Sequence, residues 1–236
     1  MAPEERLTAR QYDRWMRKRD PLAHCMRFAM TPAGAIFVNT PVFMVPRELG
    51  LRPDHRLLDL GCGQVSIARL LASMVPFRTP PVGVDVSPTM LRLGQHALRD
   101  GGWPPVELVQ GPATTLPFAD ESFDVVVSAH MVKHLSDDSL RRCFAEVLRV
   151  LRPGGAFLLW EFTVTGSRLL NRLNHCVLTL EVKTARLRTF RQLALLGLEC
   201  GFQRVLSLEL RPFLLPPIPR ISVLMGKAAR WDSSSA

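Results

Sequence analysis

The chain has 236 residues, of which 47% are hydrophobic and 7% aromatic, and it carries a formal net charge of +9. This length suits one domain with a mostly aliphatic core. No apolar run reaches the roughly 20 residues that span a bilayer, which excludes a membrane-spanning helix. The five cysteines are scattered and include no C-x-x-C pair, which argues against a disulfide scaffold and a zinc site.

The basic excess is uneven along the chain. Residues 1–50 hold three more basic than acidic residues, residues 51–150 hold one fewer, and residues 151–236 hold seven more. A basic flank attracts an anionic substrate, nucleic acid or a membrane surface, whereas a GC-rich genome enriches a sequence in arginine without any such partner. Both interpretations remain open, because charge alone identifies no partner.

The predicted elements begin with a weak helical pattern from residue 4 to about residue 30 and an apolar, proline-broken cover over residues 31–46. The first twenty residues lack the apolar stretch of a secretory signal, so we expect a cytoplasmic protein. From residue 56 onward, short Val/Leu runs alternate with helical patterns, which predicts βαβ units and a parallel sheet buried on both faces. The predicted strands are residues 56–60, 82–85, 106–109, 123–128 and 156–162. The predicted helices are residues 65–75, 88–98 and 137–150, the last with a stop at Pro153 to Gly155.

The alternation of predicted strands and helices ends after residue 162. Residues 163–190 form an insert with arginines and leucines, which is interpreted as a solvated basic helix, as a lid over an apolar substrate, or as a surface for a partner or membrane. A helix over residues 190–200 and strands over 203–210 and 220–227 follow. No helix separates the last two strands, so we expect an antiparallel pair at one sheet edge. The expected fold is therefore α/β, with a Rossmann-like, seven-stranded, mostly parallel sheet, an antiparallel last strand and helices on both faces.

The sharpest chemical signal is the segment Leu58-Asp-Leu-Gly-Cys-Gly63, which follows the first strand and opens a helix. Glycines let a backbone come close to a ligand, and a helix N-terminus favours a negative group. Asp85 ends the next strand, where a carboxylate can accept from both hydroxyls of a ribose. Together these features predict a cofactor that contains a nucleoside.

The residues in the turn favour one cofactor over another. A dinucleotide site would need Gly-x-Gly-x-x-Gly, but Ser66 occupies the sixth position. Asp59 would repel a pyrophosphate, whereas it suits a cationic amino-acid group. The sequence therefore favours S-adenosylmethionine over NAD.

Five segments follow one another in a familiar order, namely Leu58–Gly63, Gly83–Pro88, Leu116–Asp120, Ser122–Ser128 and Leu148–Gly155. They resemble the successive motifs of the class I S-adenosylmethionine-dependent methyltransferases, and most of all the small-molecule subgroup with quinone and sterol C-methyltransferases. The likeness runs from about Leu57 to Phe162.

The resemblance implies a single methyltransferase domain that transfers a methyl group to a small, partly apolar molecule by in-line displacement. Its expected parts are an N-terminal helical cover (1–50), a cofactor-binding half (51–162), a substrate-side insert (163–190) and a C-terminal helix with the antiparallel strand pair (191–230).

The resemblance also implies which residues surround the cofactor. The methionine end would lie on Asp59, Gly61, Cys62 and Gly63. Asp85 would hold the ribose. The adenine would lie near Val86, Met90, Gly111, Pro112 and Ala113, and Ser128 and His130 would border the cofactor after the fourth strand.

Two residues depart from the family pattern. Val65 stands where a third glycine is usual, and its side chain either crowds the methionine carboxylate or points into the core. Pro112 stands where the family commonly has an aspartate that accepts from the adenine amine, and one net hydrogen bond is worth about 0.5–1.5 kcal/mol. These departures also leave room for a non-catalytic relative.

Candidate catalytic residues lie at strand ends and loops on the expected ligand side. His134 and His130 are candidates for a general base, or His134 simply packs. Glu161 is a candidate for a substrate contact, or a surface charge on an edge strand. The two histidines have the spacing of metal ligands on a helix, but no third ligand lies nearby in sequence, so no metal is expected.

The N-terminal aromatic residues and the basic flank leave further alternatives open. Tyr12 and Trp15 resemble the helix that often covers the cofactor in this family, or they form a core aromatic pair. Two rival functions remain: an inactive methyltransferase-like binding protein, and an RNA or protein methyltransferase. The sequence shows no Asn/Asp-Pro-Pro-aromatic motif for planar nitrogen acceptors, which counts against the latter.

Overall fold

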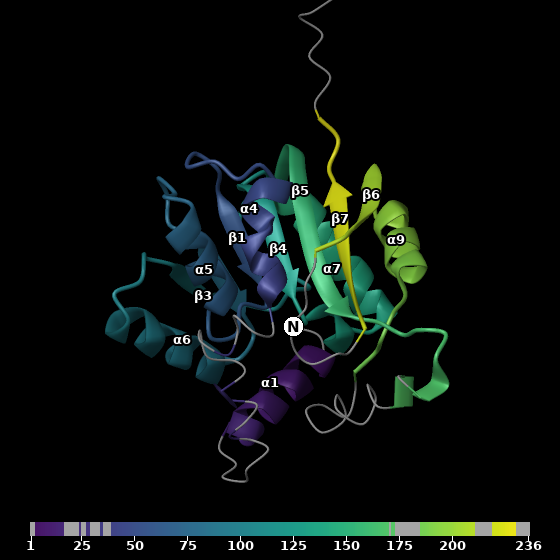
Figure 1. Ribbon diagram of the computed structural model, residues 1–236, viewed down its shortest axis with the longest axis horizontal. Coiled ribbons are helices and arrows are strands. Elements are labelled where there is room, and N and C mark those ends of the chain that lie inside the picture. The colour runs from purple at the N-terminus through teal and green to yellow at the C-terminus, as the bar shows by residue number, and fades with distance from the viewer. Residues whose placement is uncertain are drawn as a thin grey trace, which may run out of the picture.

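The computed structural model describes residues 3–16, 24, 27–28, 34, 39–169, 171–172, 185–210 and 219–229. Within these ranges the strands form one seven-stranded sheet in the order β3-β2-β1-β4-β5-β7-β6 (Figure 1). They are β1 (Leu57–Leu60), β2 (Val82–Asp85), β3 (Glu107–Gln110), β4 (Phe123–Ala129), β5 (Leu151–Phe162), β6 (Arg204–Leu208) and β7 (Arg220–Gly226).

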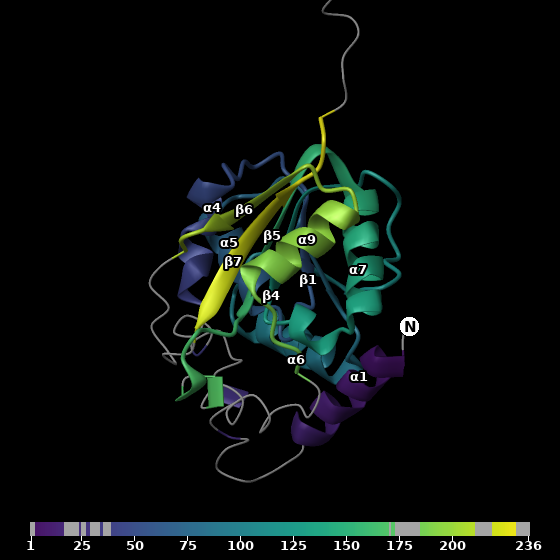
Figure 2. The ribbon, with the colours of Figure 1, turned by 90° about the vertical axis from the view of Figure 1, so that its right-hand side faces the viewer.

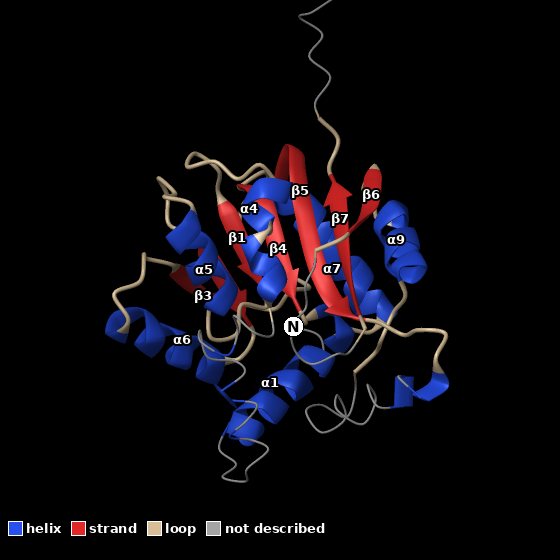
Figure 3. Cartoon of the chain, viewed as in Figure 1, coloured by secondary structure: helices blue, strands red, loops and turns tan. Residues whose placement is uncertain are grey.

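The direction of the strands confirms the predicted sheet. Every pair from β3 to β5 is parallel, and β7 runs antiparallel to both β5 and β6. In Figure 3 the arrow of β7 points opposite to those of β4 and β5. The expected α/β fold with an antiparallel last strand is therefore correct.

Helices cover both faces of the sheet (Figure 2). One face carries η1 (Thr40–Phe43), α4 (Val45–Glu48), α5 (Ser66–Met74) and α6 (Pro88–Asp100), and the other carries α7 (Asp137–Val150) and α9 (Phe190–Glu199). Successive residues of a strand pack on opposite faces of the sheet. Leu57 lies in the hydrophobic cluster that includes α5, whereas Leu58 lies in the cluster that includes α7 and α9. Because both faces are buried, the strands read as unbroken apolar runs rather than as alternating ones.

The largest error in a predicted boundary is at the start of β5. The stop at Pro153 to Gly155 was expected to separate a helix from a strand beginning at residue 156, but β5 begins at Leu151, directly after α7. The pairing with β4 absorbs the extra residues, because Leu151 pairs with Phe123 and Ala156 pairs with Val125 across a register shift. Gly154 adopts a left-handed φ of 78° there, a conformation that glycine takes without strain.

Helix α1 (Pro3–Met16) lies across the carboxyl ends of the parallel strands (Figure 1). Glu4 accepts hydrogen bonds from Ser136 N at 2.8 Å and Ser136 Oγ at 2.6 Å. Asp13 accepts from Ser87 Oγ at 2.8 Å. Ser136 and Ser87 are the N-cap residues of α7 and α6. Carboxylates at both ends of α1 therefore fix it over the edge where parallel strands present their ligand sites.

Some predictions fall outside the described residues. The helix predicted from residue 4 is described as far as Met16, and most of the pattern up to residue 30 lies outside the described ranges, as does the side chain of Trp15. The same holds for residues 173–184 of the predicted insert. The division of the chain into four segments stays a prediction.

No helix in the described part of the chain is both long and apolar enough to cross a bilayer.

Candidate active site

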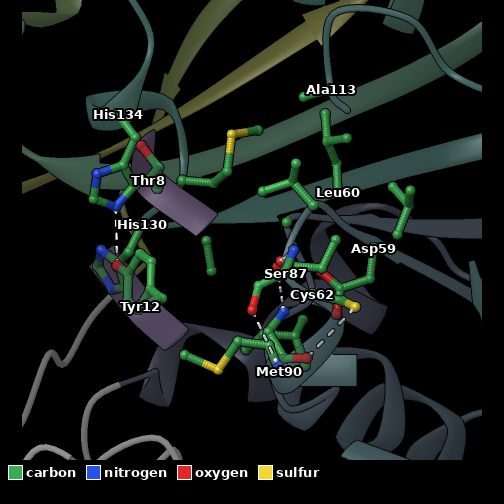
Figure 4. Close-up of a pocket in the computed structure, with 18 of the residues that line it drawn as sticks. Thr8, Tyr12, Asp59, Leu60, Cys62, Ser87, Met90, Ala113, His130 and His134 are labelled. Carbon is green, nitrogen blue, oxygen red and sulfur yellow. Dashed lines mark hydrogen bonds between the residues drawn. The ribbon is translucent and has the colours of Figure 1, made fainter. Parts of the chain in front are cut away.

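A pocket opens at the carboxyl ends of β1, β2, β3 and β4, beneath α1. Its wall combines the turn after β1, the residues after β2 and β3, the segment after β4, and one face of α1. Figure 4 shows Asp59 and Cys62 on one side of this pocket and Tyr12, His130 and His134 on the other. We call the first side the cofactor end and the second the acceptor end, after the roles expected from the sequence.

The turn after β1 is held by backbone geometry. Gly61 N and Cys62 N both donate to Val84 O, at 2.8 and 3.0 Å. Gly61 and Gly63 adopt left-handed φ values of 74° and 53°. A Cβ on Gly61 would lie 2.4 Å from Met131 Cγ, whereas a Cβ on Gly63 would meet no protein atom within 4 Å. The turn therefore needs Gly61 for the protein's own packing, and Gly63 leaves the pocket side open.

Asp85 closes β2 and faces this turn. Its Oδ2 accepts from Gly63 N at 2.9 Å and its Oδ1 accepts from Ser87 N at 2.8 Å. Burial raises the pKa of Asp85, although these N–H donors oppose the rise. Because each carboxylate oxygen can accept a further hydrogen bond, Asp85 is placed to bind a pair of hydroxyls.

Asp59 forms the floor of the cofactor end. Its side chain is 1% exposed, and its Oδ2 accepts from Ala68 N at 3.1 Å. Burial raises the pKa of the carboxyl to about 7 despite the Ala68 N–H, and the charge of Asp85 adds to the rise. A buried carboxylate of this kind favours a cation beside it.

The structure decides between the two placements that the sequence left open for Val65. Its backbone is left-handed, with φ at 64°, where a β-branched residue is strained. Its side chain is fully buried against Cys62, Ala68 and Val106 and does not line the pocket. The methionine side of the pocket is therefore not crowded by this residue.

Most of the predicted cofactor residues reach the pocket. Those that line it are Asp59, Gly61, Cys62, Gly63, Asp85, Val86, Met90, Gly111, Ala113 and His130. Pro112 and Ser128 do not line it. Ser128 Oγ instead donates to Leu60 O at 2.9 Å and ties β4 to β1. The roles of Pro112 and Ser128 at the cofactor therefore stay predictions that the pocket lining does not support.

The acceptor end contains a buried charged cluster. Glu161 is 2% exposed and accepts from Lys133 N at 3.1 Å and Phe162 N at 2.9 Å. The Lys133 ammonium lies 3.7 Å from Glu161 Oε1 and donates to His130 O. The alternative that Glu161 is a surface charge is wrong, because β5 lies between β4 and β7. Glu161 does not line the pocket and meets it through His130 and Lys133.

The charges around His130 set its protonation. His130 Nδ1 lies 3.6 Å from Glu161 Oε1, and its ring stacks on Phe162 at 4.4 Å between centroids. Burial lowers the pKa of His130 to about 4, although Glu161 opposes the shift. Burial would raise the pKa of Glu161, but Lys133 and His130 outweigh it and lower that pKa to about 2. At neutral pH the cluster therefore pairs a neutral His130 imidazole with an ionised Glu161 carboxylate.

His134 meets the covering helix. Its Nε2 lies 3.0 Å from Tyr12 Oη, and the two rings meet edge to face. Burial lowers the pKa of His134 well below its usual value. Both rings line the pocket. Tyr12 is therefore a pocket residue on the covering helix, as the resemblance implied.

The pocket residues that were missed from the sequence include Glu5, Thr8, Lys133 and Phe162. The spacing of Glu5, Thr8 and Tyr12 by three and four residues is a helical stripe that could have revealed one face of α1. Lys133 lies between two histidines that had been singled out. Phe162 gave no signal, because a strand-end phenylalanine is ordinary core.

The middle of the chain is similar to known methyltransferases. Residues 58–159 match a family described as a methyltransferase domain. The ubiquinone/menaquinone biosynthesis C-methyltransferase UbiE of Ectopseudomonas mendocina is 38% identical over 127 residues, which cover 52% of this chain and 48% of that protein. The chain thus spans about half the length of the curated relatives it matches.

Solved structures show the same architecture. A SAM-dependent methyltransferase from Methanosarcina mazei has a TM-score of 0.61 at 26% identity, covering 78% of this chain and 97% of that one. Phosphoethanolamine N-methyltransferase 2 from Haemonchus contortus has a TM-score of 0.69 at 18% identity, covering 92% of this chain and 60% of that one. At that lower identity the likeness concerns the fold alone.

Proposed function

On the premise that residues 58–159 are a methyltransferase domain similar to that of UbiE, we propose that the chain is a class I S-adenosylmethionine-dependent methyltransferase and that it methylates a small, partly apolar molecule. The observation that carries the proposal is the facing pair of the glycine turn and Asp85, joined by the hydrogen bond from Gly63 N to Asp85 Oδ2. A ligand on this pair meets open space at Gly63 and a carboxylate suited to ribose hydroxyls.

The residues present fit S-adenosylmethionine. Asp85 would hold the ribose, and Val86 and Met90 offer apolar contacts for the base. Asp59 would lie toward the cationic amino-acid part, which suits its buried carboxylate. A pyrophosphate would instead meet the Asp59 charge, which disfavours a dinucleotide.

The bound cofactor would supply an electrophilic methyl group, so the protein mainly aligns the acceptor atom and excludes water. We propose that α1 excludes water by covering the pocket. Where the acceptor must lose a proton, the neutral His130 ring takes it. Glu161, 3.6 Å from His130 Nδ1, stabilises the charged form of the ring, and Phe162 stacks on the ring. His134, held by Tyr12, lines the same end and positions the acceptor.

The acceptor end favours a partly apolar molecule. Met131, Leu135 and Phe162 line it, and the polar groups among them are those of Tyr12, His130, Lys133 and His134. Such a wall binds an apolar body with a few polar atoms, as small-molecule pockets generally do. We propose that the segment from residue 163 to 190 contributes to acceptor choice, because it follows β5 directly beside this end.

The first test is a calorimetric titration with S-adenosylmethionine and with NAD as the comparison ligand. We expect saturable binding of S-adenosylmethionine and none of NAD. A second assay follows transfer of a labelled methyl group to a panel of phenols, quinols and short-chain amines. If S-adenosylmethionine does not bind, the result favours the alternative hypothesis of an inactive methyltransferase-like protein, which the departures of Val65 and Pro112 from the family pattern suggested.

A methyltransferase acting on RNA remains the second candidate because of the basic excess after residue 150. It predicts RNA binding that weakens steeply with salt. A gel shift that compares RNA with DNA of the same length separates the two candidates. Preferential retardation of RNA supports the RNA enzyme, whereas equal retardation of both nucleic acids reports the basic flank alone.

We also propose that the protein works in the cytoplasm. The described cysteines Cys62, Cys143 and Cys200 are free thiols, which suits a reducing compartment. Peripheral contact with a membrane through the basic segment after residue 162 stays a proposal as well. Cell fractionation with membrane washing at high salt tests both statements together.

A further inference from the structure

Helix α1 turns one face toward the pocket. Glu5, Thr8 and Tyr12, spaced by three and four residues, all line it, and Thr8 and Tyr12 can be followed in Figure 4. Glu5 is 4% exposed. A buried carboxylate costs free energy unless it receives hydrogen bonds. The donors around Glu5 therefore matter for its role.

Glu5 meets the loop that follows β3. Thr114 N donates to Glu5 Oε1 at 3.2 Å, and Thr114 Oγ donates to Glu5 Oε2 at 2.7 Å. Glu5 also lines the pocket. It therefore brings carboxylate oxygens to the wall beside Ala113, the residue that precedes Thr114.

The loop itself offers no side-chain acceptor to the pocket at this place. Gly111 and Ala113 line the wall, and neither carries a polar side chain. Pro112 has neither a polar side chain nor an N–H group. The Thr114 hydroxyl donates to Glu5. On the face of α1 that lines the pocket, Thr8 offers a hydroxyl and Glu5 a carboxylate, and it is Glu5 that contacts this loop, through Thr114.

The sheet register brings the adenine of the proposed cofactor to this loop. Asp85 pairs with Gln110 across β2 and β3, and Gly111 N donates to Asp85 O at 3.1 Å. A base attached to a ribose on Asp85 would therefore reach the residues directly after Gln110. The adenine 6-amino group is a donor, and without an acceptor its burial would cost affinity.

We propose that Glu5 accepts a hydrogen bond from the adenine 6-amino group and so makes helix α1 part of the cofactor's recognition site. The inference rests on the proposed function. It gives α1 two tasks, because one helix both closes the pocket and selects a 6-aminopurine. It also explains how the chain tolerates Pro112 in the loop after β3: the acceptor comes from a helix 109 residues away in sequence from Thr114.

The test compares two ligands on matched variants. S-adenosylhomocysteine carries the 6-amino group, whereas S-inosylhomocysteine carries a 6-oxo group that a carboxylate repels. We expect the wild type to prefer the amino ligand by about tenfold to a hundredfold, the range of a hydrogen bond to a charged group. In Glu5→Gln the side chain keeps its size and offers an NH₂ donor to the 6-oxo group, so the preference should fall by about tenfold or more.

Glu4→Gln is the matched control, since Glu4 lies on the same helix and binds Ser136 outside the pocket lining. It should weaken both ligands alike and leave the preference unchanged. Glu5→Asp is a second variant that keeps the charge but shortens the reach, and it should also lower the preference. Thermal melts of all three variants confirm that they are folded.

The outcomes separate the two proposals. If the wild type binds neither ligand, the proposed function fails. If it binds S-adenosylhomocysteine and both Glu5 variants keep the wild-type preference, the function stands and the role of Glu5 is refuted. In that case Glu5 only ties α1 to Thr114.

Discussion

The two ends of the pocket are built by different means. At the cofactor end, backbone groups near in sequence hold the site, as in the bond from Gly63 N to Asp85, 22 residues apart. At the acceptor end, side chains from distant segments meet, and the contact between Tyr12 and His134 spans 122 residues. Backbone geometry tolerates little change, whereas a site made of side chains can be rebuilt by substitution. This difference in construction explains how one fold can keep a cofactor and change its acceptor.

The largest expected effect concerns the acceptor end, where a substitution should change catalysis without changing the affinity for the cofactor. His130→Ala should lower kcat by roughly 10² to 10⁴-fold, the range for loss of a general base, while the affinity for S-adenosylmethionine stays near the wild-type value. His96→Ala, on the exposed side of α6, is the control. In the wild type, activity should fall as pH drops through about 4, because burial lowers the pKa of His130 to that value. Loss of cofactor binding in His130→Ala would contradict the separation.

The next effect concerns the ribose carboxylate. Asp85→Ala removes two charge-assisted hydrogen bonds to hydroxyls, and we expect S-adenosylmethionine to bind about 100-fold more weakly. Calorimetry measures the change, with the exposed Asp100→Ala as its control. A loss below about threefold would mean that the ribose lies elsewhere.

A third comparison lies within the cofactor end. Gly61→Ala and Gly63→Ala both place a side chain at a left-handed φ, but only Gly61→Ala meets Met131. We expect Gly61→Ala to have a free energy of unfolding lower than that of Gly63→Ala by about 1–3 kcal/mol, the usual cost of overpacking. Urea unfolding measures this. Gly63→Ala should instead weaken cofactor binding. Its methyl group would meet no protein atom and would occupy space on the pocket side that the cofactor needs. Equal stability of the two variants would remove the packing role assigned to Gly61.

The smallest effect follows the protonation of Asp59. Burial raises the pKa of Asp59 from 3.8 to about 7. Between about pH 4 and pH 7, Asp59 therefore keeps its proton in the folded protein without ligand and loses it in the unfolded chain. Folding stability therefore falls as pH rises from about 4 to 7. A cationic ligand prefers the ionised form, so affinity for S-adenosylmethionine should rise with pH, by up to about tenfold per unit below pH 7. In Asp59→Asn this dependence should vanish; a wild-type affinity flat from pH 5 to 7 would count against the cation contact.

Much of the fold followed from local patterns. The bounds of α7 were predicted to the residue, since Ser136 Oγ accepts from Ser139 N and fixes the start of the helix. β2 was predicted equally well, because a short apolar run between turns has few alternatives. The start of β5 was missed, because Pro153 and Gly154 usually mark a turn and only the pairing with β4 shows that the strand continues through them.

The sequence by itself determined the cofactor end: the glycine turn, Asp59 and Asp85 lie at fixed offsets from two strands, and short-range backbone bonds place them. Only the tertiary structure decided three other matters, namely that Val65 points into the core, that Glu161 is buried beside Lys133, and that Glu5 reaches the loop after β3. The physical reason is the range of the contacts. A helix or strand pattern encodes what lies within a few turns, whereas burial and long-range hydrogen bonds depend on which segments the packed sheet and α1 bring together.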